Sequence, residues 1–177
     1  MRIAPVLPGT RPELAAQEAA IAAARGRISP LYQVLLNSPA VAHGWEQMLS
    51  AIRNHNSLSP ALRELVILRV AVLNNAPYEF EAHAPIAAAA GVSAAAIARI
   101  QNATPVDDRT DSLSDFSPID CLVIRLTDAM TRNIEVPDLL YSEIQQHFST
   151  QNQLDLVATI AAYNMVSRLL VALKIGH

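Results

Sequence analysis

The chain has 177 residues, a length that fits one domain with a sizeable core better than it fits two domains. Hydrophobic residues make up 51% and charged residues only 16%, so we expect some apolar surface to be buried between the subunits of a homo-oligomer. The net charge of −3 argues against nucleic acid as a partner, because no basic stripe is present to neutralise phosphates.

The N-terminal sequence MRIAPVLPG lacks the continuous apolar run of a signal peptide. No window reaches the roughly 18 consecutive apolar residues that a membrane-spanning helix needs. The longest candidate, 154–170, is interrupted by Asp155, Asn164 and Arg168. We therefore predict a cytoplasmic protein without a membrane partner. The single cysteine, Cys121, can form neither an internal disulfide nor a Cys-x-x-Cys pair.

Helical periodicity dominates the chain, and no stretch alternates with the period of two that marks a half-buried strand. Clear helix-boundary signals support this pattern. Ser59 is a typical helix cap and Pro60 a typical first helical residue, and Gly26 follows the end of the first predicted helix. The predicted helices cover about 12–25, 30–37, 41–54, 60–74, 77–91, 94–101, 118–131, 137–147 and 150–175. We expect an all-α bundle of about seven to nine helices.

The segment 103–116, with the sequence ATPVDDRTDSLSDF, is polar, acidic and without periodicity. It is predicted to be a surface loop that divides the chain into two helical halves. The letters ELV at 64–66 align with DLV at 155–157, which hints at two related helical hairpins. Chance similarity between two amphipathic helices explains this short match equally well.

Three ionisable residues in the segment 62–91 form the strongest candidate site. Glu64 stands in an otherwise apolar helix, where a carboxylate is costly unless it is hydrogen-bonded or paired. Glu79 and His83 are four residues apart on the next helix and therefore share a face. A buried Glu beside a His forms a coupled pair suited to acid–base catalysis near neutral pH. Tyr78 adds a phenol that can donate to a developing oxyanion.

Less specific interpretations of these residues remain open. A Glu–His pair at this spacing is usually a solvated surface pair, and Glu64 can simply bridge or cap the core. A metal site is disfavoured because Glu79 and His83 have no third ligand nearby in the sequence. Pro85 removes a backbone donor and crowds the carbonyl of Glu81, so the helix should bend close to the pair.

The same stretch resembles the carboxymuconolactone decarboxylase-like superfamily, whose dithiol branch comprises the AhpD-like hydroperoxidases. Their pattern is a Glu early in one helix, then Cys-x-x-Cys and a His four residues after the second Cys. Counted from Glu64, the two cysteine positions fall on Ala76 and Glu79, the polar residue between them on Tyr78, and the His on His83. The segments YNMVSRLLVAL at 163–173 and SPAVAHGWEQML at 38–49 also resemble the longer non-thiol members.

The resemblance implies an AhpD-like domain over 28–177 and an N-terminal helical extension over 1–27. It also implies a homo-oligomer. Both cysteines of the dithiol motif are absent, so the dithiol peroxidase cycle is not available. Cys121 lies far away in the apolar segment CLVIRL, where a buried core position is the expected role.

Three further residues are candidates for substrate binding. Asn164 and Arg168 are polar positions four apart in the apolar last helix, and Arg168 can bind a substrate carboxylate or pair with an acidic group at a helix or subunit contact. Trp45 can line a pocket or belong to the core. By contrast, His43, His55 and His147 stand in polar surroundings and are expected to face solvent.

The leading functional expectation is a cofactor-free lyase or isomerase that acts on a small carboxylated lactone or keto acid. His83 shuttles a proton, Glu79 holds or shares it, Glu64 orients the imidazole and Tyr78 steadies an enolate oxygen. One alternative is a non-catalytic binding or assembly protein, in which Glu64 and His83 form a structural pair. Another is an oxidative-stress protein that uses Cys121 alone, which requires an exposed thiol.

Overall fold

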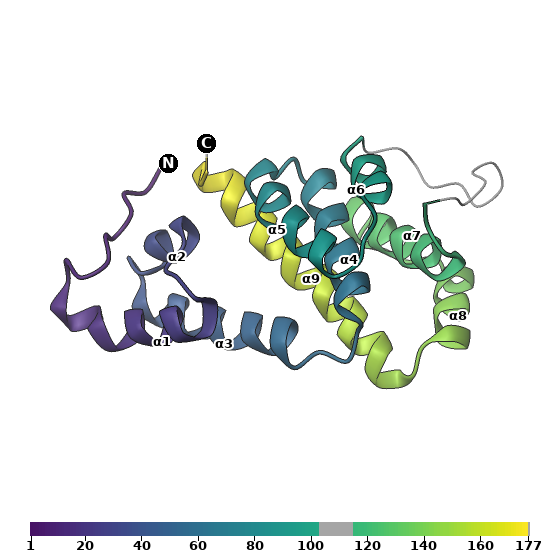
Figure 1. Cartoon of the computed structure of the whole chain (residues 1–177). Helices are drawn as coiled ribbons and strands as arrows, with labels where there is room; N and C mark the ends of the chain where they lie inside the picture. Colours follow the sequence, from purple (N-terminus) through teal and green to yellow (C-terminus); the bar gives the residue numbers. More distant parts are fainter. Residues whose placement is uncertain (103–114, 177) are drawn as a thin grey trace. The chain divides into compact units, whose positions relative to one another are not determined.

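The computed structural model describes residues 1–102 and 115–176, and the regular structure in these two ranges is helical throughout. Figure 1 labels the helices along the chain. A short 3-10 turn, η1 (Pro12–Leu14), precedes nine α-helices in the described residues. These are α1 (Ala15–Arg25), α2 (Pro30–Leu35), α3 (Pro39–Asn54), α4 (Pro60–Leu73), α5 (Pro77–Ala89), α6 (Ala94–Gln101), α7 (Pro118–Arg132), α8 (Asp138–His147) and α9 (Thr150–Leu173). The predicted all-α class is confirmed.

Most helix starts follow from local sequence. Proline occupies the first turn of six of the elements, where its missing N–H leaves no helical bond unmade. Ser59 caps α4 by accepting a hydrogen bond from the backbone N–H of Leu62 at 3.2 Å, and Ser117 and Asp120 form a reciprocal capping box on α7. Gly26, with φ +76°, ends α1 in the left-handed conformation that glycine adopts readily.

The described chain divides into two compact units. Unit 1 consists of Met1–Asn56 with Leu170–His177, and unit 2 consists of Ser57–Leu169. The predicted boundary between an extension over 1–27 and a domain over 28–177 is a different kind of division, and it stays a prediction. The predicted loop over 103–116 lies almost entirely outside the described residues.

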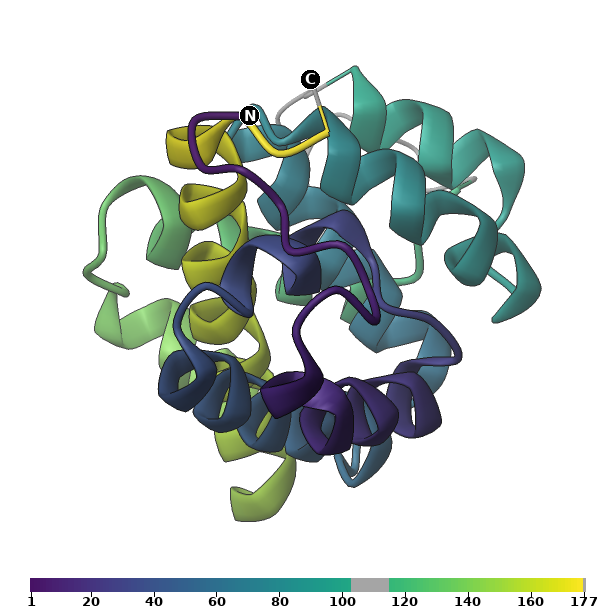
Figure 2. The ribbon, with the colours of Figure 1, turned by 90° about the vertical axis from the view of Figure 1, so that its left-hand side faces the viewer.

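In unit 1, α1 and α3 pack against each other, as Figure 2 shows, and α2 packs against α3. The buried carboxylate of Glu46 on α3 joins these helices. It accepts hydrogen bonds from the Arg25 guanidinium at 2.8 Å, from the Ser50 hydroxyl at 2.6 Å and from the Tyr32 hydroxyl. Burial raises the pKa of Glu46, but the hydrogen bonds from Ser50, Tyr32 and Arg25 outweigh it and lower the pKa below its usual range.

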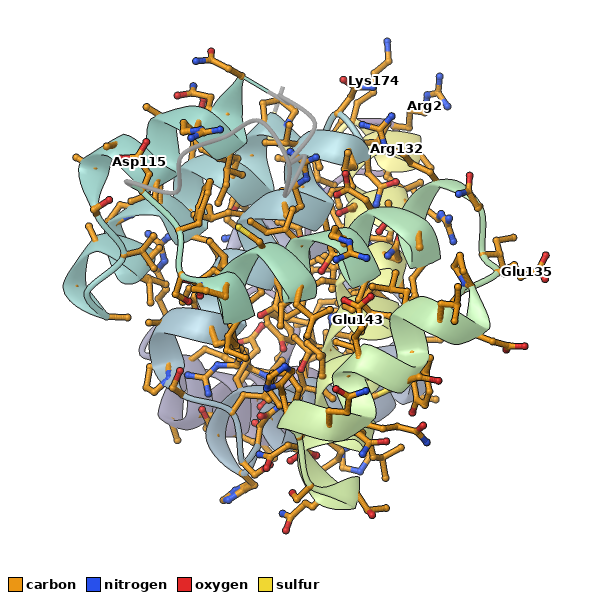
Figure 3. The ribbon with its side chains drawn as sticks, turned by 90° about the vertical axis from the view of Figure 1, so that its right-hand side faces the viewer. Arg2, Asp115, Arg132, Glu135, Glu143 and Lys174 are labelled. Atoms are coloured by element: carbon orange, nitrogen blue, oxygen red, sulfur yellow. The ribbon has the colours of Figure 1, made fainter. Side chains whose placement is uncertain are left out.

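Unit 2 is built around α4, which packs against α5, α6 and α7. Its eight consecutive residues 64–71 are all buried, so this helix is covered on every side. Arg69 on α4 forms a two-pronged salt bridge with Asp128 on α7, with both N–O distances at 2.6 Å. Arg125 of α7 pairs at 3.1 Å with Glu143 of α8, which is labelled in Figure 3.

Helix α5 continues through Pro85 to Ala89. The proline leaves the carbonyl of Glu81 without its helical donor, but Glu81 is exposed and solvent can take that place. The predicted bend at this position stays a prediction.

Helix α9 is long and apolar enough to cross a membrane by length and composition alone. Half of its most apolar window is buried inside the protein, and helices that belong to a protein core meet the same criteria of length and composition. This helix is therefore weak evidence for a membrane span.

Candidate functional site

Glu64 and His83 meet across the contact between α4 and α5. The imidazole Nδ1 lies 2.7 Å from the Glu64 Oε2 atom, and the two residues are 1% and 8% exposed. Glu64 is held in place because every neighbour from Leu65 to Ala71 is also buried. The predicted burial of Glu64 is thus confirmed, and the compensation that such a carboxylate requires comes from the histidine.

This contact defines the chemistry of the imidazole. A carboxylate can only accept hydrogen bonds, so Nδ1 donates to Glu64 and Nε2 is left as the nitrogen that can take up or give a proton. The ring of Tyr163 on α9 stands edge-on to the imidazole, with centroids 5.3 Å apart and planes at 89°. Together, Glu64 and Tyr163 restrict the orientation of the ring.

Glu79 lies one turn before His83 on α5 and is 2% exposed. The hydroxyl of Ser167 on α9 donates to its Oε2 atom, while its Oε1 atom is buried and has no hydrogen-bond partner among the described residues. Burial raises the pKa of Glu79 from its ordinary value to about 8, although the Ser167 bond acts in the opposite direction. At neutral pH this residue is therefore mainly a neutral carboxylic acid.

The hydrogen-bond partners of His83 and Glu79 differ from the Glu79–His83 pair that the sequence predicts. Glu79 and His83 were expected to be coupled because they are four residues apart on one helix. In the structure the hydrogen bond of His83 goes to Glu64, and that of Glu79 goes to Ser167. Both partners come from other helices, α4 and α9, and both are buried. The site is therefore assembled by three helices, which Figure 1 identifies.

The other candidate residues lie in different surroundings. Tyr78 is half-buried in the first turn of α5. Asn164 is buried and accepts from Asn74 at 3.0 Å, and its own amide donates to the Thr131 hydroxyl and the Ile160 carbonyl. These bonds connect α9 with Asn74 and with α7, and substrate binding by Asn164 stays a prediction.

Arg168 and Trp45 stay predictions as substrate-binding residues. Arg168 is exposed on α9, so it does not share the buried position of Asn164 one turn earlier. Trp45 belongs to unit 1, whereas Glu64, Glu79 and His83 belong to unit 2. Its side chain is 8% exposed, and the indole N–H is buried without a hydrogen-bond partner among the described residues.

Sequence reasoning missed two residues on α9, Tyr163 and Ser167. They are four apart and are 2% and 0% exposed, and they contact His83 and Glu79 respectively. The spacing of four residues between Tyr163 and Ser167 places both on one face of α9, and this signal could have identified the inward face of the helix. Each stands one residue before a predicted site residue, Asn164 or Arg168.

The remaining sequence expectations concern cysteine, histidine and ligands. Cys121 is 3% exposed and packs in the hydrophobic core of unit 2 with Leu65, Leu68 and Ile124. This burial contradicts the alternative of a peroxide-sensing thiol, which requires exposure. His43, His55 and His147 are exposed, as predicted. Within residues 1–102 and 115–176, no group of three or more His, Cys, Asp or Glu side chains is placed to hold a metal ion.

Comparison with known proteins places this geometry in context. The model of the carboxymuconolactone decarboxylase family matches residues 39–109, which include Glu64, Tyr78, Glu79 and His83. A search of curated proteins gives no significant match.

Solved structures share the fold over nearly the whole chain. The debrominase Bmp8, in complex with 2,3,4-tribromopyrrole, is 12% identical with a TM-score of 0.78, and the match covers 99% of this chain and 90% of the debrominase. An uncharacterised peroxidase-related protein from Silicibacter sp. TM1040 is 15% identical, with a TM-score of 0.75 and coverage of 97% and 87%. An uncharacterised peroxidase-related protein with an AhpD core, from Ralstonia eutropha JMP134, is 14% identical, with a TM-score of 0.77 and coverage of 97% and 90%. At these identities the likeness establishes the fold alone.

Proposed function

The chain belongs to the carboxymuconolactone decarboxylase-like superfamily and lacks the paired cysteines of its dithiol branch, and from this premise we propose that it is a lyase or isomerase using acid–base chemistry. Its substrate is a small carboxylated lactone or keto acid, and the reaction needs no cofactor. The observation that carries the proposal is the buried Glu64–His83 hydrogen bond, with the buried Glu79 one turn before His83 on the same helix.

His83 is the proposed proton carrier. Its Nε2 atom takes a proton from carbon in an isomerisation, or delivers one to carbon after carbon dioxide has left. In either case the imidazolium forms or is consumed beside the Glu64 carboxylate, which stabilises its charge and keeps the ring in one tautomer. Glu64 is therefore a positioning residue in this mechanism.

Glu79 and Tyr78 supply the proposed stabilisation of the enolate. When the bond to the carboxylate carbon or to the proton breaks, its electron pair moves onto the neighbouring carbonyl oxygen. A neutral carboxyl O–H donates to that oxygen without first losing a proton, and the raised pKa of Glu79 keeps it in this form at neutral pH. The phenol of Tyr78 is the second proposed donor.

The test is turnover of γ-carboxymuconolactone and a panel of carboxylated lactones and β-keto acids. We expect His83→Ala to lower the rate by about 10²–10⁴ at matched thermal stability. His147→Ala, which removes an exposed histidine on α8, is the matched control and should keep full activity. The proposal fails if wild type and His83→Ala turn over a substrate at equal rates.

One observation favours a second function, a non-catalytic binding or assembly protein. The Glu64–His83 and Ser167–Glu79 bonds each connect two different helices, which is also what a structural cross-link does. On that interpretation His83→Ala lowers the melting temperature, and neither protein turns over the panel. Including 2,3,4-tribromopyrrole in the panel extends the test to the ligand of the structurally similar debrominase.

Assembly and localisation are part of the same proposal. In unit 2 the side chains of Ile134, Leu139 and Leu154 are 82%, 83% and 68% exposed, which supports burial of apolar surface in a homo-oligomer. Sedimentation of the purified protein tests this, and a monomer at micromolar concentration contradicts it. A cytoplasmic location stays a prediction, which fractionation of cells tests.

A further inference from the structure

Ser167 differs from two other fully buried hydroxyl side chains on the helices of unit 2. Thr127 and Thr159 are fully buried too, and each donates to the carbonyl four residues earlier in its own helix, at 2.8 and 2.6 Å. This local bond is the usual choice for a buried hydroxyl in a helix. The hydroxyl of Ser167 instead donates across the helix contact to Glu79.

The two oxygens of Glu79 are therefore in different environments. Oε2 receives the Ser167 hydrogen, whereas Oε1 is buried and has no partner in the described residues. A neutral carboxyl group carries its proton on one oxygen only. An oxygen that already accepts a short hydrogen bond is the poorer place for that proton, because the two hydrogens would be directed at each other.

We infer that Ser167 is a positioning residue that fixes the tautomer of Glu79, with the acid proton on Oε1 and that O–H directed at a hydrogen-bond acceptor of the substrate. The acceptor class comes from the proposed acid–base function, in which a carbonyl or enolate oxygen is the atom that needs a donor, and the unpartnered Oε1 is the oxygen of Glu79 left to supply it. The role of the Glu79 O–H in catalysis rests on the proposed acid–base function, whereas the hydrogen bond between Ser167 and Glu79 does not depend on it.

The opposite tautomer makes the opposite prediction. If Glu79 donated to Ser167, the hydrogen bond would stabilise the neutral form of the acid and hold its pKa up. If Ser167 donates to Glu79, the bond stabilises the carboxylate and holds the pKa down. Removing the hydroxyl therefore raises the pKa of Glu79 if its bond to the carboxylate is the stronger one, and lowers the pKa or leaves it unchanged if its bond to the neutral acid is at least as strong.

Other titratable or charged groups on these helices stay unchanged in this comparison. They include Glu64 and Arg69 on α4, His83 on α5, Tyr163 and Arg168 on α9, and Asp128 on α7, which pairs with Arg69. Because Ser167→Ala alters none of them, the change in the titration of Glu79 reports the lost hydroxyl.

The experiment is a pH titration of the Glu79 carboxyl carbon by NMR in protein labelled with ¹³C-glutamate. Glu79→Gln identifies the signal by its disappearance. We expect a wild-type midpoint of about 8 and a Ser167→Ala midpoint about one pH unit or more higher, as befits a lost bond to a charged group. Ser167→Thr keeps the hydroxyl and should return the midpoint towards the wild-type value.

A Ser167→Ala midpoint equal to or below that of wild type overturns the inference, whether or not any substrate is turned over. Where a substrate of the panel is found, the alkaline limb of the kcat profile should move upward with the NMR midpoint. An inactive wild-type protein with an upward NMR shift would sink the proposed function and leave the role of Ser167 intact.

Discussion

The Nδ1 atom of His83 on α5 lies 2.7 Å from the Oε2 atom of Glu64 on α4, and both side chains are buried. Since the two residues are 19 positions apart, the contact exists only when α4 and α5 are packed together. A histidine oriented in this way has one nitrogen committed to the carboxylate and one available for proton transfer. The working geometry of the site is therefore a product of the helix packing.

Replacing Glu64 by Gln should separate the orientation of His83 from its charge. The amide can still accept the Nδ1 hydrogen, but it does not stabilise an imidazolium, so we expect kcat to fall by about 10²–10⁴. KM should change less, because Glu64 acts through His83 and does not touch the substrate. Steady-state kinetics on a substrate of the panel measures this. Glu81→Gln, which neutralises an exposed carboxylate on α5, should leave kcat unchanged.

Glu79 should make the stability of the protein depend on pH. Its pKa rises from 4.5 in the unfolded chain to about 8 in the folded protein, so between these values the folded state keeps a proton that the unfolded chain has released. The contribution of this residue is most favourable below about pH 4.5 and is lost as the pH rises towards 8.

Glu79→Gln has no such titration. Compared with wild type, the variant should gain up to about 5 kcal/mol in free energy of unfolding between about pH 4.5 and pH 8. Denaturant unfolding at several pH values measures the difference, with Glu81→Gln as the exposed control. A difference between wild type and Glu79→Gln that is constant over this range would show that Glu79 is ionised in the folded protein.

Much of the fold could be predicted because its signals are local. Pro60 and Pro77 each open a helix where predicted, since proline at the first turn acts within a few residues, and Ser59 adds a side-chain cap to the first of these helices. Glu64 could be identified as buried because its neighbours on all sides of the helix are apolar. The end of α5 is less well defined by local signals and lies at Ala89, two residues before the predicted Gly91.

The partners of the site residues could not be predicted, because they come from distant parts of the chain. Ser167 is 88 residues from Glu79, and Tyr163 is 80 residues from His83. Nothing in the sequence around Glu79 distinguishes a Ser167 partner from a His83 partner. The spacing of four residues indicated the local pair, and the packing of α9 determined the actual one.

Asn164 and Arg168 should differ in what they contribute, although they are four residues apart on α9. Asn164→Ala removes the partner of the buried Thr131 and of the partly buried Asn74, and leaving a buried polar group unsatisfied costs about 1–3 kcal/mol. Arg168→Ala should change stability by less than about 0.5 kcal/mol because the residue is exposed.

Thermal unfolding of the two variants makes this comparison. A loss of stability in Arg168→Ala as large as that in Asn164→Ala would contradict it. If Arg168 binds a substrate carboxylate, Arg168→Ala should raise KM while the melting temperature stays at the wild-type value.

The salt bridge between Arg69 and Asp128 should be among the most sensitive contacts in unit 2. The Arg69 side chain is 1% exposed, so Asp128→Ala leaves a buried guanidinium without its carboxylate and should cost about 3–5 kcal/mol. Glu143→Ala breaks the Arg125 pair, whose side chains are 31% and 46% exposed, and should cost at most about 1 kcal/mol.

Denaturant unfolding of both single variants measures this difference in the free energy of unfolding. The double variant Arg69→Met/Asp128→Leu then shows how much of the loss in Asp128→Ala comes from the unpaired charge. Replacing both charges by apolar groups of similar size should recover most of the lost stability, because no charge is then left buried and unpaired. If the double variant is as unstable as Asp128→Ala, the salt bridge stabilises the contact between α4 and α7 in its own right. In that event, loss of the salt bridge should also perturb the Glu64–His83 contact, because Glu64 and Arg69 are both on α4. A lower kcat of Asp128→Ala would report this change.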